Sequence, residues 1–593
     1  MTLSYDLKAF ISSLELSNGL RLELSNDSIV VFLGPNNSGK STALSNIVSA
    51  INSHSEMAPG LVVASVDVER SQPFAEVYAV AKRHAGPDEL VRMGGNSFYL
   101  SNVHNWWNAT GGALGALGTF LVSYLPTRQR LNDCEPPQSI DLTKQEPSHP
   151  IQLMYRDHTY ELAVSALFRK AFAEDLVLHR AAGQVVPLYV GARPILAPGE
   201  DPTHLSYVKR LEELKPLSTQ GDGMVSFASL VIRLKVEGRA IQIVDEPEAF
   251  LHPPQARLIG QILSSDDVGK QLFVATHNSD VIRGLLAGAT TRLTLVRLQR
   301  SQAKFKAKAL SADEVARLWK DPILRYSNVL EGLFHGGVVV TEGDADCKFY
   351  DAITSASIPD NERADAFYTY SGGKHRIPVI VRALKGLAVP VSSVVDFDTL
   401  NNERPLRDIV EAHGGSWADY DRDWTSIKAT VESSKNYLNA ERFAREVTDL
   451  LAKVRGDKAV PKDTIRAFRD ACTQASPWAE AKKRGIDGLP SGEPQVRARA
   501  LIERLAAIGI FLIPSGEMEG FCRTIGNHGP RWVEQVLELD LSGSDDLAAA
   551  RKFVRRINDN LLEQLAVEAQ DTEQATDFAG VDPASRGELT SSL

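Results

Sequence analysis

The segment that decides the fold is "SIVVFLGPNNSGKSTALSNIVSAI", residues 28–51. Its apolar start predicts a buried strand, its middle "GPNNSGKS" matches G-x-x-x-x-G-K-[ST], and its end "TALSNIVSAI" is compatible with a helix. In this context the glycines let the backbone curl around phosphates, Lys40 reaches the β- and γ-phosphate oxygens, and Ser41 holds Mg²⁺. A glycine-rich turn that binds nothing is the plainer interpretation, and the strand, the helix and the Lys-Ser pair together argue against it. The predicted nucleotide-binding residues are Gly34, Pro35, Asn36, Asn37, Ser38, Gly39, Lys40, Ser41 and Thr42.

Two later apolar runs supply partners for this loop. The run in "AIQIVDEPEAFLHP", residues 240–253, ends in Asp245 and Glu246. An Asp at a strand end beside a phosphate loop can anchor the magnesium shell, and the next Glu can act as general base on the attacking water. In "QLFVATHNSDVI", residues 271–282, His277 follows a third run and could reach the γ-phosphate. Alone, Asp-Glu-Pro suits an ordinary turn and a single His is more often structural, so the predicted ATP hydrolysis depends on their position.

The composition is that of a folded protein. A chain of 593 residues exceeds one hydrophobic core, so we expect at least two domains. The net charge of -10 excludes a globally basic nucleic-acid binder and leaves room for local patches and metal ions. Four well-separated cysteines indicate neither a disulfide framework nor a zinc site. The start lacks a secretory leader and no run of about 18 apolar residues occurs, so we expect a soluble, cytoplasmic protein.

Apolar runs that alternate with helix-like stretches predict an α/β fold with mainly parallel sheets. The first predicted domain spans residues 1–330 and carries a helical insertion at 75–190. The second spans residues 335–565, with a charge-rich helical insert at 405–505. The acidic tail, residues 566–593, is predicted to be mobile.

Three apolar runs of the second half end in acidic residues. Because the carboxyl ends of parallel strands meet at one edge of a sheet, we expect these side chains to gather there. Carboxylates suit Mg²⁺ or Mn²⁺, and two ions about 4 Å apart can stabilise both the attacking and the leaving oxygen of a phosphodiester displacement. The plainer interpretation is helix capping, above all by Asp344 and Asp398. The acids are Glu342, Asp344, Asp346, Asp396, Asp398, Glu517 and Glu519.

The phosphate loop, "DEPEAFLHP" and "ATHNSD", in this order, resemble the ABC-type ATPase head shared by structural-maintenance-of-chromosomes (SMC) proteins and the overcoming-lysogenization-defect (OLD) family. The resemblance covers residues 1–330 with the middle inserted, and it implies ATP sandwiched between two heads of a homodimer or higher oligomer. The segment "LSTQGDGMVSFASL", residues 217–230, stands where the loop from the second subunit belongs, although it departs from the usual Leu-Ser-Gly-Gly. A plain glycine-rich helix entry is the alternative. The candidate ATP contacts in this segment are Ser218, Gly221 and Gly223.

The acidic strand ends resemble the Toprim domain of topoisomerases, primases and OLD-family nucleases, which has a Glu-Gly and a later Asp-x-Asp. Here these are Glu342-Gly343 and Asp396-Phe397-Asp398. The resemblance implies that Glu342 is also a catalytic general base, and that Glu517 or Glu519 fills the later acidic position. The implied metal ligands are Ser41 and Asp245 at the ATP site, and Glu342, Asp346, Asp396, Asp398, Glu517 and Glu519 at the Toprim site.

The glycine turn in "YSGGKHRIPVIVRAL", residues 370–384, also fits a Toprim element, in which Lys374 could hold a backbone phosphate; a simple turn fits equally well. OLD nucleases place a lysine beyond the last acidic motif, and here none follows until Lys552. Arg523 or Arg531 could substitute, although Arg and Lys are not interchangeable.

The two resemblances imply an OLD-family, Gabija-like endonuclease that is controlled by ATP, uses Mg²⁺ or Mn²⁺, and defends against phage. DNA is the favoured substrate and RNA stays open. The alternative is an ATP-driven sensor or scaffold that binds nucleic acid without cleaving it and signals to a partner effector protein. The missing lysine favours that alternative, and the intact acidic clusters oppose it. A topoisomerase or primase is a third option, without a zinc ribbon or a distinctive tyrosine to support it.

Overall fold

The structure is a computed structural model in which the chain divides into two compact units, residues 1–325 and 326–593. The residues that it describes are 7–52, 62–93, 96–109, 111–145, 147–265, 270–288, 291–301, 304–322, 328–433, 440–454, 459–474, 476, 478–526 and 528–579.

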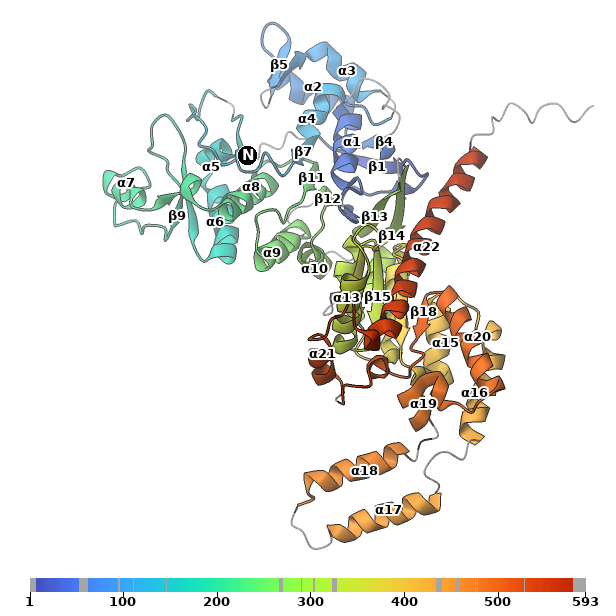
Figure 1. The fold of residues 1–593 in the computed structure, drawn as a ribbon. Helices are drawn as coiled ribbons and strands as arrows, with labels where there is room; N and C mark the ends of the chain where they lie inside the picture. Colours follow the sequence, from blue (N-terminus) through green and yellow to red (C-terminus); the bar gives the residue numbers. More distant parts are fainter. Residues whose placement is uncertain are drawn as a thin grey trace, which may run out of the picture. The chain divides into compact units, whose positions relative to one another are not determined.

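A six-stranded sheet forms the centre of the first unit (Figure 1). All its neighbouring strands pair in parallel except the antiparallel pair β13–β14. The three central strands are buried along their whole length, as parallel strands covered on both faces require. The expectation of a mainly parallel sheet is confirmed here. In spatial order the strands are β14 (Lys304–Leu310), β13 (Leu293–Ser301), β3 (Ile29–Leu33), β12 (Gln271–Ala275), β11 (Ile241–Asp245) and β7 (Val122–Leu125).

Helix α1 (Lys40–Asn52) follows β3 through the phosphate loop. Its buried residues recur at helical spacing, from Ala43 and Leu44 to Ile51, and so form one apolar face. That face shares a core with an antiparallel sheet in the order β2 (Arg21–Glu23), β1 (Ala9–Leu16), β4 (Val63–Arg70).

The predicted helical insertion at 75–190 is in fact mixed. It contains strands as well as helices, and β7 within it belongs to the central sheet. The sequence did not indicate β7 because the strand has four residues and follows a glycine-rich stretch. The elements from residue 74 to 216 are α2 (Phe74–Arg83), β5 (Leu90–Met93), β6 (Asn96–Tyr99), α3 (Leu100–Trp107), α4 (Gly118–Leu121), β7, α5 (Pro150–Arg156), α6 (His158–Phe172), β8 (Asp175–Leu178), β9 (Leu188–Gly191), α7 (Leu205–Glu212) and β10 (Lys215–Pro216).

The rest of the first unit is mainly helical between the strands of the central sheet. Helix α8 is almost entirely buried, and α9 and α10 pack against each other through Gly260 and Gly284. These helices are α8 (Asp222–Val236), α9 (Pro253–Leu263), α10 (Ser279–Gly288) and α11 (Ala312–Trp319).

The second unit contains a four-stranded, all-parallel sheet in the order β16 (Ala366–Tyr370), β15 (Gly337–Thr341), β17 (Val391–Val395), β18 (Ile510–Leu512). Its core joins strand residues to side chains of α13 (Asp344–Ser357), α21 (Pro530–Val536) and α22 (Ala548–Ala579). Helix α14 (Ile377–Gly386) lies between β16 and β17 in the chain.

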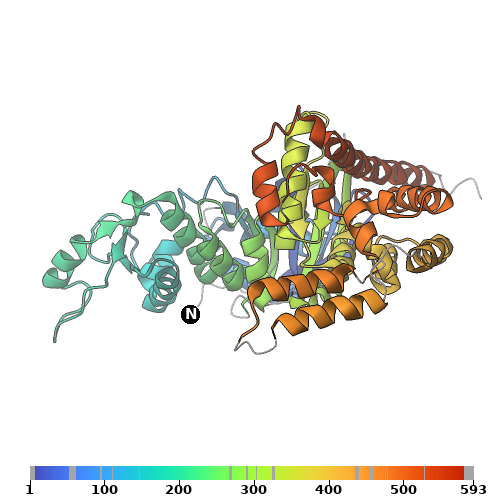
Figure 2. The same ribbon diagram turned by 60° about the horizontal axis from the view of Figure 1, so that its bottom comes forward.

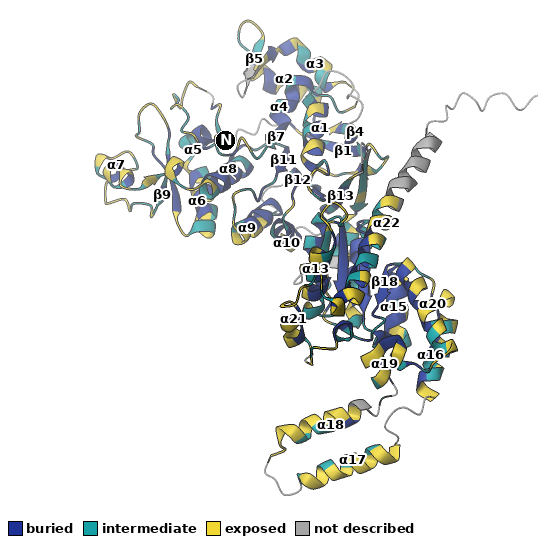
Figure 3. Cartoon of the chain, viewed as in Figure 1, coloured by how far each residue is buried: buried dark blue, intermediate teal, exposed yellow. Residues whose placement is uncertain are grey.

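The described residues of the segment predicted as a helical insert at 405–505 are mainly helical. Helices α17 and α18 lie side by side in Figures 1 and 2 and are almost wholly exposed in Figure 3. The insert consists of α15 (Glu403–Ala412), α16 (Asp421–Ser433), α17 (Ala440–Lys453), α18 (Lys462–Gln474), α19 (Ala479–Arg484) and α20 (Glu493–Ala507).

Helix α22 continues to residue 579, so the start of the segment predicted as a mobile tail is helical, and residues 580–593 lie outside the described part. Within the described residues, none of the helices combines the length and the apolar character that a membrane span needs.

Candidate functional site

The phosphate loop joins β3 to α1 with a backbone that its glycines make possible. Gly34 has φ +137° and Gly39 has φ +94°. A Cβ on Gly34 would lie 2.1 Å from the carbonyl oxygen of Leu298, and one on Gly39 would lie 2.6 Å from the Phe305 ring. Any larger residue would therefore open the loop.

Lys40 lies beneath this loop and is 7% exposed. Its Nζ donates to the carbonyl oxygens of Gly34 and Pro35, at 2.9 Å each. Burial lowers the pKa of the Lys40 ammonium, and nearby carboxylates, above all Glu246, oppose that shift. A positive charge under a curled loop is the arrangement that a phosphate site needs.

The start of α1 and the end of β11 meet at Ser41 and Asp245. The Ser41 hydroxyl donates to Asp245 Oδ1 at 3.0 Å. Burial raises the pKa of Asp245, and the charge of Glu246 raises it further. The two predicted magnesium-shell residues, 204 positions apart, are thus in direct contact.

Glu246 and His277 face each other at the ends of β11 and β12. His277 Nδ1 lies 3.5 Å from Glu246 Oε1 and 3.3 Å from Glu248 Oε1. The Glu246 backbone has φ 45°, a left-handed conformation, and its N–H donates to the Ala275 carbonyl at 2.8 Å. This turn directs Glu246 toward the phosphate-loop edge of the sheet.

Glu248 was missed by the sequence analysis. It is 5% exposed, and its Oε1 accepts from the Thr276 hydroxyl and from the His277 backbone N–H, both at 2.9 Å. Burial raises its pKa. Glu248 therefore fixes the backbone that carries His277, and the second acid of "DEPE" was the available sign of it.

Arg130 and Thr127 were also missed, because they follow the unrecognised strand β7. Arg130 is fully buried, and its Nη2 donates to the carbonyl oxygens of Asp245 at 3.0 Å and Glu246 at 2.6 Å. The Thr127 hydroxyl donates to the Asp245 carbonyl at 3.2 Å. Both side chains hold the Asp-Glu turn in place.

The candidate loop for a second subunit lies at the entry of α8. Ser218 and Gly221 are exposed. Gly223 lies so close to the turn after Glu246 that a Cβ would be 2.7 Å from the Phe250 carbonyl oxygen. Their predicted contacts with ATP across a dimer stay a prediction.

In the second unit the acids follow the ends of three adjacent parallel strands. Glu342 Oε1 accepts the Asp396 backbone N–H at 3.2 Å, which ties the end of β15 to the end of β17. Burial, and then the charge of Glu342, raise the pKa of Asp396 to about 8. Burial raises the pKa of Asp346 to about 6, with contributions from Glu342 and Glu519. Burial and the neighbouring carboxylates therefore both disfavour the charged form of these two acids.

Helix capping, which was expected of Asp344 and Asp398, is seen instead for Asp346. Asp346 Oδ2 accepts the Gly343 N–H at 2.9 Å at the start of α13. Asp344 instead pairs with Lys348 at 2.7 Å in solvent. Asp398 pairs with Lys374 Nζ at 3.0 Å and Lys482 Nζ at 3.3 Å, and these lysines help to lower its pKa against the effect of burial.

Lys374 and Lys482 place positive charge beside Asp398, and the order of residues in the chain gave no sign of this for Lys482. Lys482 comes from α19 in the helical insert, before the last acidic motif rather than after it. The glycine turn before Lys374 wraps Glu342, because the N–H groups of Gly372 and Gly373 both donate to the Glu342 carbonyl at 3.0 Å.

Glu342, Asp396 and Asp398 do not form a compact ligand triple. Among the described residues, the only three candidate ligands with atoms all within 4.8 Å of one another are Glu517, Glu519 and His528. His528 Nδ1 lies 3.7 Å from Glu517 Oε1 and 3.6 Å from Glu519 Oε1. No pattern in "GNHGP" indicated His528, which is an exposed loop residue.

The first unit thus has the defining parts of a P-loop nucleotide-binding domain: a phosphate loop between a buried parallel strand and a helix, and an Asp-Glu end on a strand of the same sheet.

No family model matches the chain, and no curated protein matches it. Solved structures similar to it include an SMC head bound to the C-winged helix domain of ScpA, at 12% identity and a TM-score of 0.33, covering 52% of this chain and 99% of that one. The SMC head domain from Thermotoga maritima has 13% identity, a TM-score of 0.28, and coverage of 51% and 99%. The cbiO1 protein from Clostridium perfringens, part of the ABC transporter complex cbiONQ, has 12% identity, a TM-score of 0.27, and coverage of 54% and 96%. At these scores the likeness carries no argument about activity or partners.

Proposed function

We propose that the first unit binds and hydrolyses ATP with Mg²⁺ in an ABC-type head. The observation that carries this is the contact between Ser41 and Asp245 beside the buried ammonium of Lys40. These oxygens are a fitting donor set for Mg²⁺, which would supply charge neutralisation at the β- and γ-phosphates.

The chain's own residues account for the rest of the reaction. Lys40 and the loop amides bind the phosphates, Glu246 accepts the proton of the attacking water, and His277 lies beside the terminal phosphate. The water oxygen bonds to the γ-phosphorus as the bond to the β,γ-bridging oxygen breaks, which yields ADP and phosphate. Ser218, Gly221 and Gly223 close the site from a second copy of the chain.

The test is ATP binding and phosphate release by the full chain and by Lys40→Ala. We expect the variant to lose both, because the buried ammonium has no substitute in the described part of the site. Retention of ATP affinity by Lys40→Ala would contradict the proposal.

We propose, as a second function, metal-dependent cleavage of nucleic acid phosphodiesters at the acidic strand ends. The observation that favours it is that Glu342 and Asp396 follow adjacent parallel strands and are in contact, since Glu342 Oε1 accepts the Asp396 backbone N–H at 3.2 Å. Glu342, Asp346 and Asp396 carry the oxygen ligands that Mg²⁺ or Mn²⁺ prefers, and their side chains would have to approach one another to share an ion, because among the described residues only Glu517, Glu519 and His528 lie that close. Lys374 and Lys482 add positive charge for the phosphate. Glu342 takes the proton of the attacking water, whose oxygen bonds to the phosphorus as the bond from phosphorus to the leaving sugar oxygen breaks.

The alternative is an ATP-driven sensor or scaffold that binds nucleic acid without cutting it and signals to a partner protein. It is favoured by the engagement of Asp398 with two lysines instead of with its predicted co-ligands. Supercoiled DNA, and separately RNA, incubated with Mg²⁺ or Mn²⁺ and with or without ATP, decide between the two. Cleavage by the full chain that Glu342→Ala abolishes, with ATP turnover intact, supports the nuclease; binding without cleavage supports the alternative.

Defence against phage is a further part of the proposal, and plaque counts on cells expressing the full chain or Glu342→Ala test it.

A further inference from the structure

A cavity of about 610 Å³ lies next to the loop that carries Glu517 and Glu519. Its walls come from η8 (Gly485–Gly488), α20 and the segment that follows β18. Ser515 and Arg523, which line it, stand on either side of the two glutamates in the chain. The same loop thus borders both the cavity and the acidic rim, by which we mean the acidic residues that follow β15, β17 and β18.

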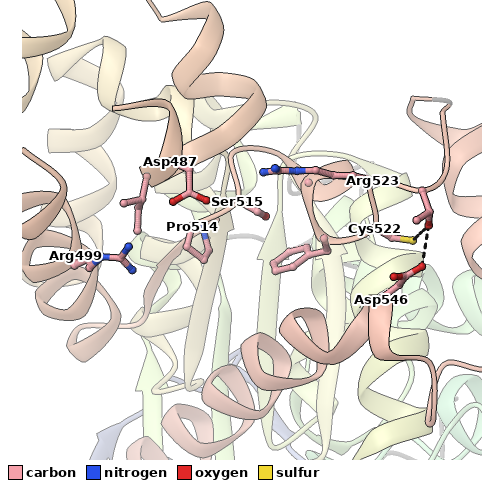
Figure 4. A pocket seen from close by; sticks show the side chains of 11 residues that line it. Asp487, Arg499, Pro514, Ser515, Cys522, Arg523 and Asp546 are labelled. Atoms are coloured by element: carbon pink, nitrogen blue, oxygen red, sulfur yellow. Dashed lines mark hydrogen bonds between the residues drawn. The ribbon is translucent and has the colours of Figure 1, made fainter. Parts of the chain in front are cut away.

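Two arginines supply the positive charge of the cavity. Figure 4 shows the side chains of Arg499 and Arg523 approaching it from opposite sides. Both arginines are exposed, and neither guanidinium makes a hydrogen bond or an ion pair within the part of the chain that the structure describes. Arg497, two residues before Arg499 on α20, instead pairs with Glu493 at 2.5 Å and with Asp423 at 3.7 Å. Pairing is therefore available to arginines on this helix, and Arg499 is left without it.

The other polar groups define what the cavity can accept. The Ser515 hydroxyl oxygen is buried and has no hydrogen-bond partner among the described residues. Asp546 accepts the Thr524 hydroxyl at 3.0 Å, which occupies one of its oxygens. Asp487 also lines the cavity, and its carboxylate disfavours a bare dianion. A nucleotide unit meets both demands, because its phosphate accepts from the arginines and its base or sugar can donate to Asp487.

We propose that this cavity is a phosphate subsite for the nucleotide that flanks the scissile bond of a single nucleic-acid strand. The inference rests on the proposed cleavage at the acidic rim. The two guanidinium groups bind the backbone phosphate, and the Ser515 hydroxyl donates to the same group. The subsite positions the strand and takes no part in bond breaking.

The experiment measures binding of a fluorescent 12-nucleotide strand, as DNA and as RNA, over a range of salt concentrations. Glu342→Gln is the parent chain, so that the strand stays intact in Mg²⁺. Each phosphate contact to a single strand contributes about 0.7 to the slope of log affinity against log salt, or roughly fivefold in affinity at 0.1 M salt. Adding Arg499→Ala and Arg523→Ala removes this one phosphate contact and should lower the slope by about 0.7 and the affinity by roughly fivefold. Arg499→Lys with Arg523→Lys should keep the slope, and Arg497→Ala is the matched control that should change neither quantity.

The outcomes separate this inference from the function on which it rests. If the parent binds the strand and the double alanine variant has the same slope, the subsite is wrong and the nuclease proposal stands. If the parent binds no strand, both the phosphate subsite and the nuclease proposal are contradicted. Thymidine 5′-monophosphate that binds as tightly as the strand, with the same dependence on both arginines, would make this a site for a free nucleotide and overturn the inference. Unchanged ATP turnover and circular dichroism confirm that the variants fold, and the two single alanine variants replace the double one if it does not.

Discussion

Replacement of Arg130 by Met should destabilise the first unit and slow ATP turnover together. Arg130 is fully buried and donates to two backbone carbonyls of the Asp-Glu turn. A hydrogen bond from a charged donor contributes about 1.5–3 kcal/mol, so the two lost bonds amount to about 3–6 kcal/mol. Met fills much of the same volume, but it leaves the carboxylates of Asp245 and Glu248 without the cation whose charge Arg130 supplies. Breaking a buried pair of this kind costs about 3–5 kcal/mol, and we take that as the expected loss.

The loss has two readouts. For a unit of 325 residues about 3–5 kcal/mol corresponds to a fall in Tm of roughly 4–7 °C, measured as the first transition in differential scanning fluorimetry. Turnover should fall by about 100-fold, because the Glu246 turn loses the groups that hold its left-handed conformation. Arg128→Met is the matched control, since Arg128 is exposed in the same loop. If Arg130→Met melts and turns over like Arg128→Met, the assignment of Arg130 to the Asp-Glu turn is wrong.

Three further changes test other parts of the structure. Glu246→Gln should keep ATP affinity and lower phosphate release by about 10²–10⁴-fold, as loss of a general base does; wild-type turnover would remove Glu246 from that role. His413 is buried beside Lys385, and burial lowers its pKa to about 3, so the folded state stays neutral while the unfolded state takes up a proton below pH 6.5. The second unit should therefore lose up to about 1.4 kcal/mol of stability per pH unit as the pH falls from 6.5 toward 3, with no effect above pH 7.5. His413→Gln should flatten the plot of Tm against pH in this range. Equal slopes for the variant and the wild type would contradict the lowered pKa of His413. His528→Ala should weaken Mn²⁺ binding, followed by electron paramagnetic resonance, more than it weakens Mg²⁺ binding, because imidazole favours the transition metal; equal effects on both ions would argue that His528 is only an ion-pair partner.

The parts of the site that sequence predicted are those in which a local pattern specifies a local structure. The strand, loop and helix from Ile29 to Asn52 are continuous in the chain, so one motif described all three. Asp245, Glu246 and His277 required one more step, namely that apolar runs ending in polar residues become neighbouring parallel strands. The order β3–β12–β11 fulfils that step and brings Ser41 and Asp245 together.

The missed residues share a different physical origin. Arg130 depends on β7, which is too short for a periodic pattern and joins the sheet by pairing with β11, far away in the chain. His528 reaches Glu519 through a loop, where the Gly529 N–H donates to Glu519 Oε1 at 2.7 Å. Contacts of this kind follow from tertiary packing and have no periodicity to detect.

The helical insert shows why sequence order misled the search for a lysine. The insert leaves the sheet after β17 and returns through α19 and α20 to β18. Its returning part delivers Lys482 to Asp398 and Arg499 to the cavity, whereas α17 buries none of its residues. A cation that a motif has after the last acidic residue can therefore come from a segment that precedes this residue in the chain. Any segment that returns to an adjacent strand reaches the same edge of the sheet. The lysine that the sequence lacked after Glu519 is thus not evidence against chemistry at this rim.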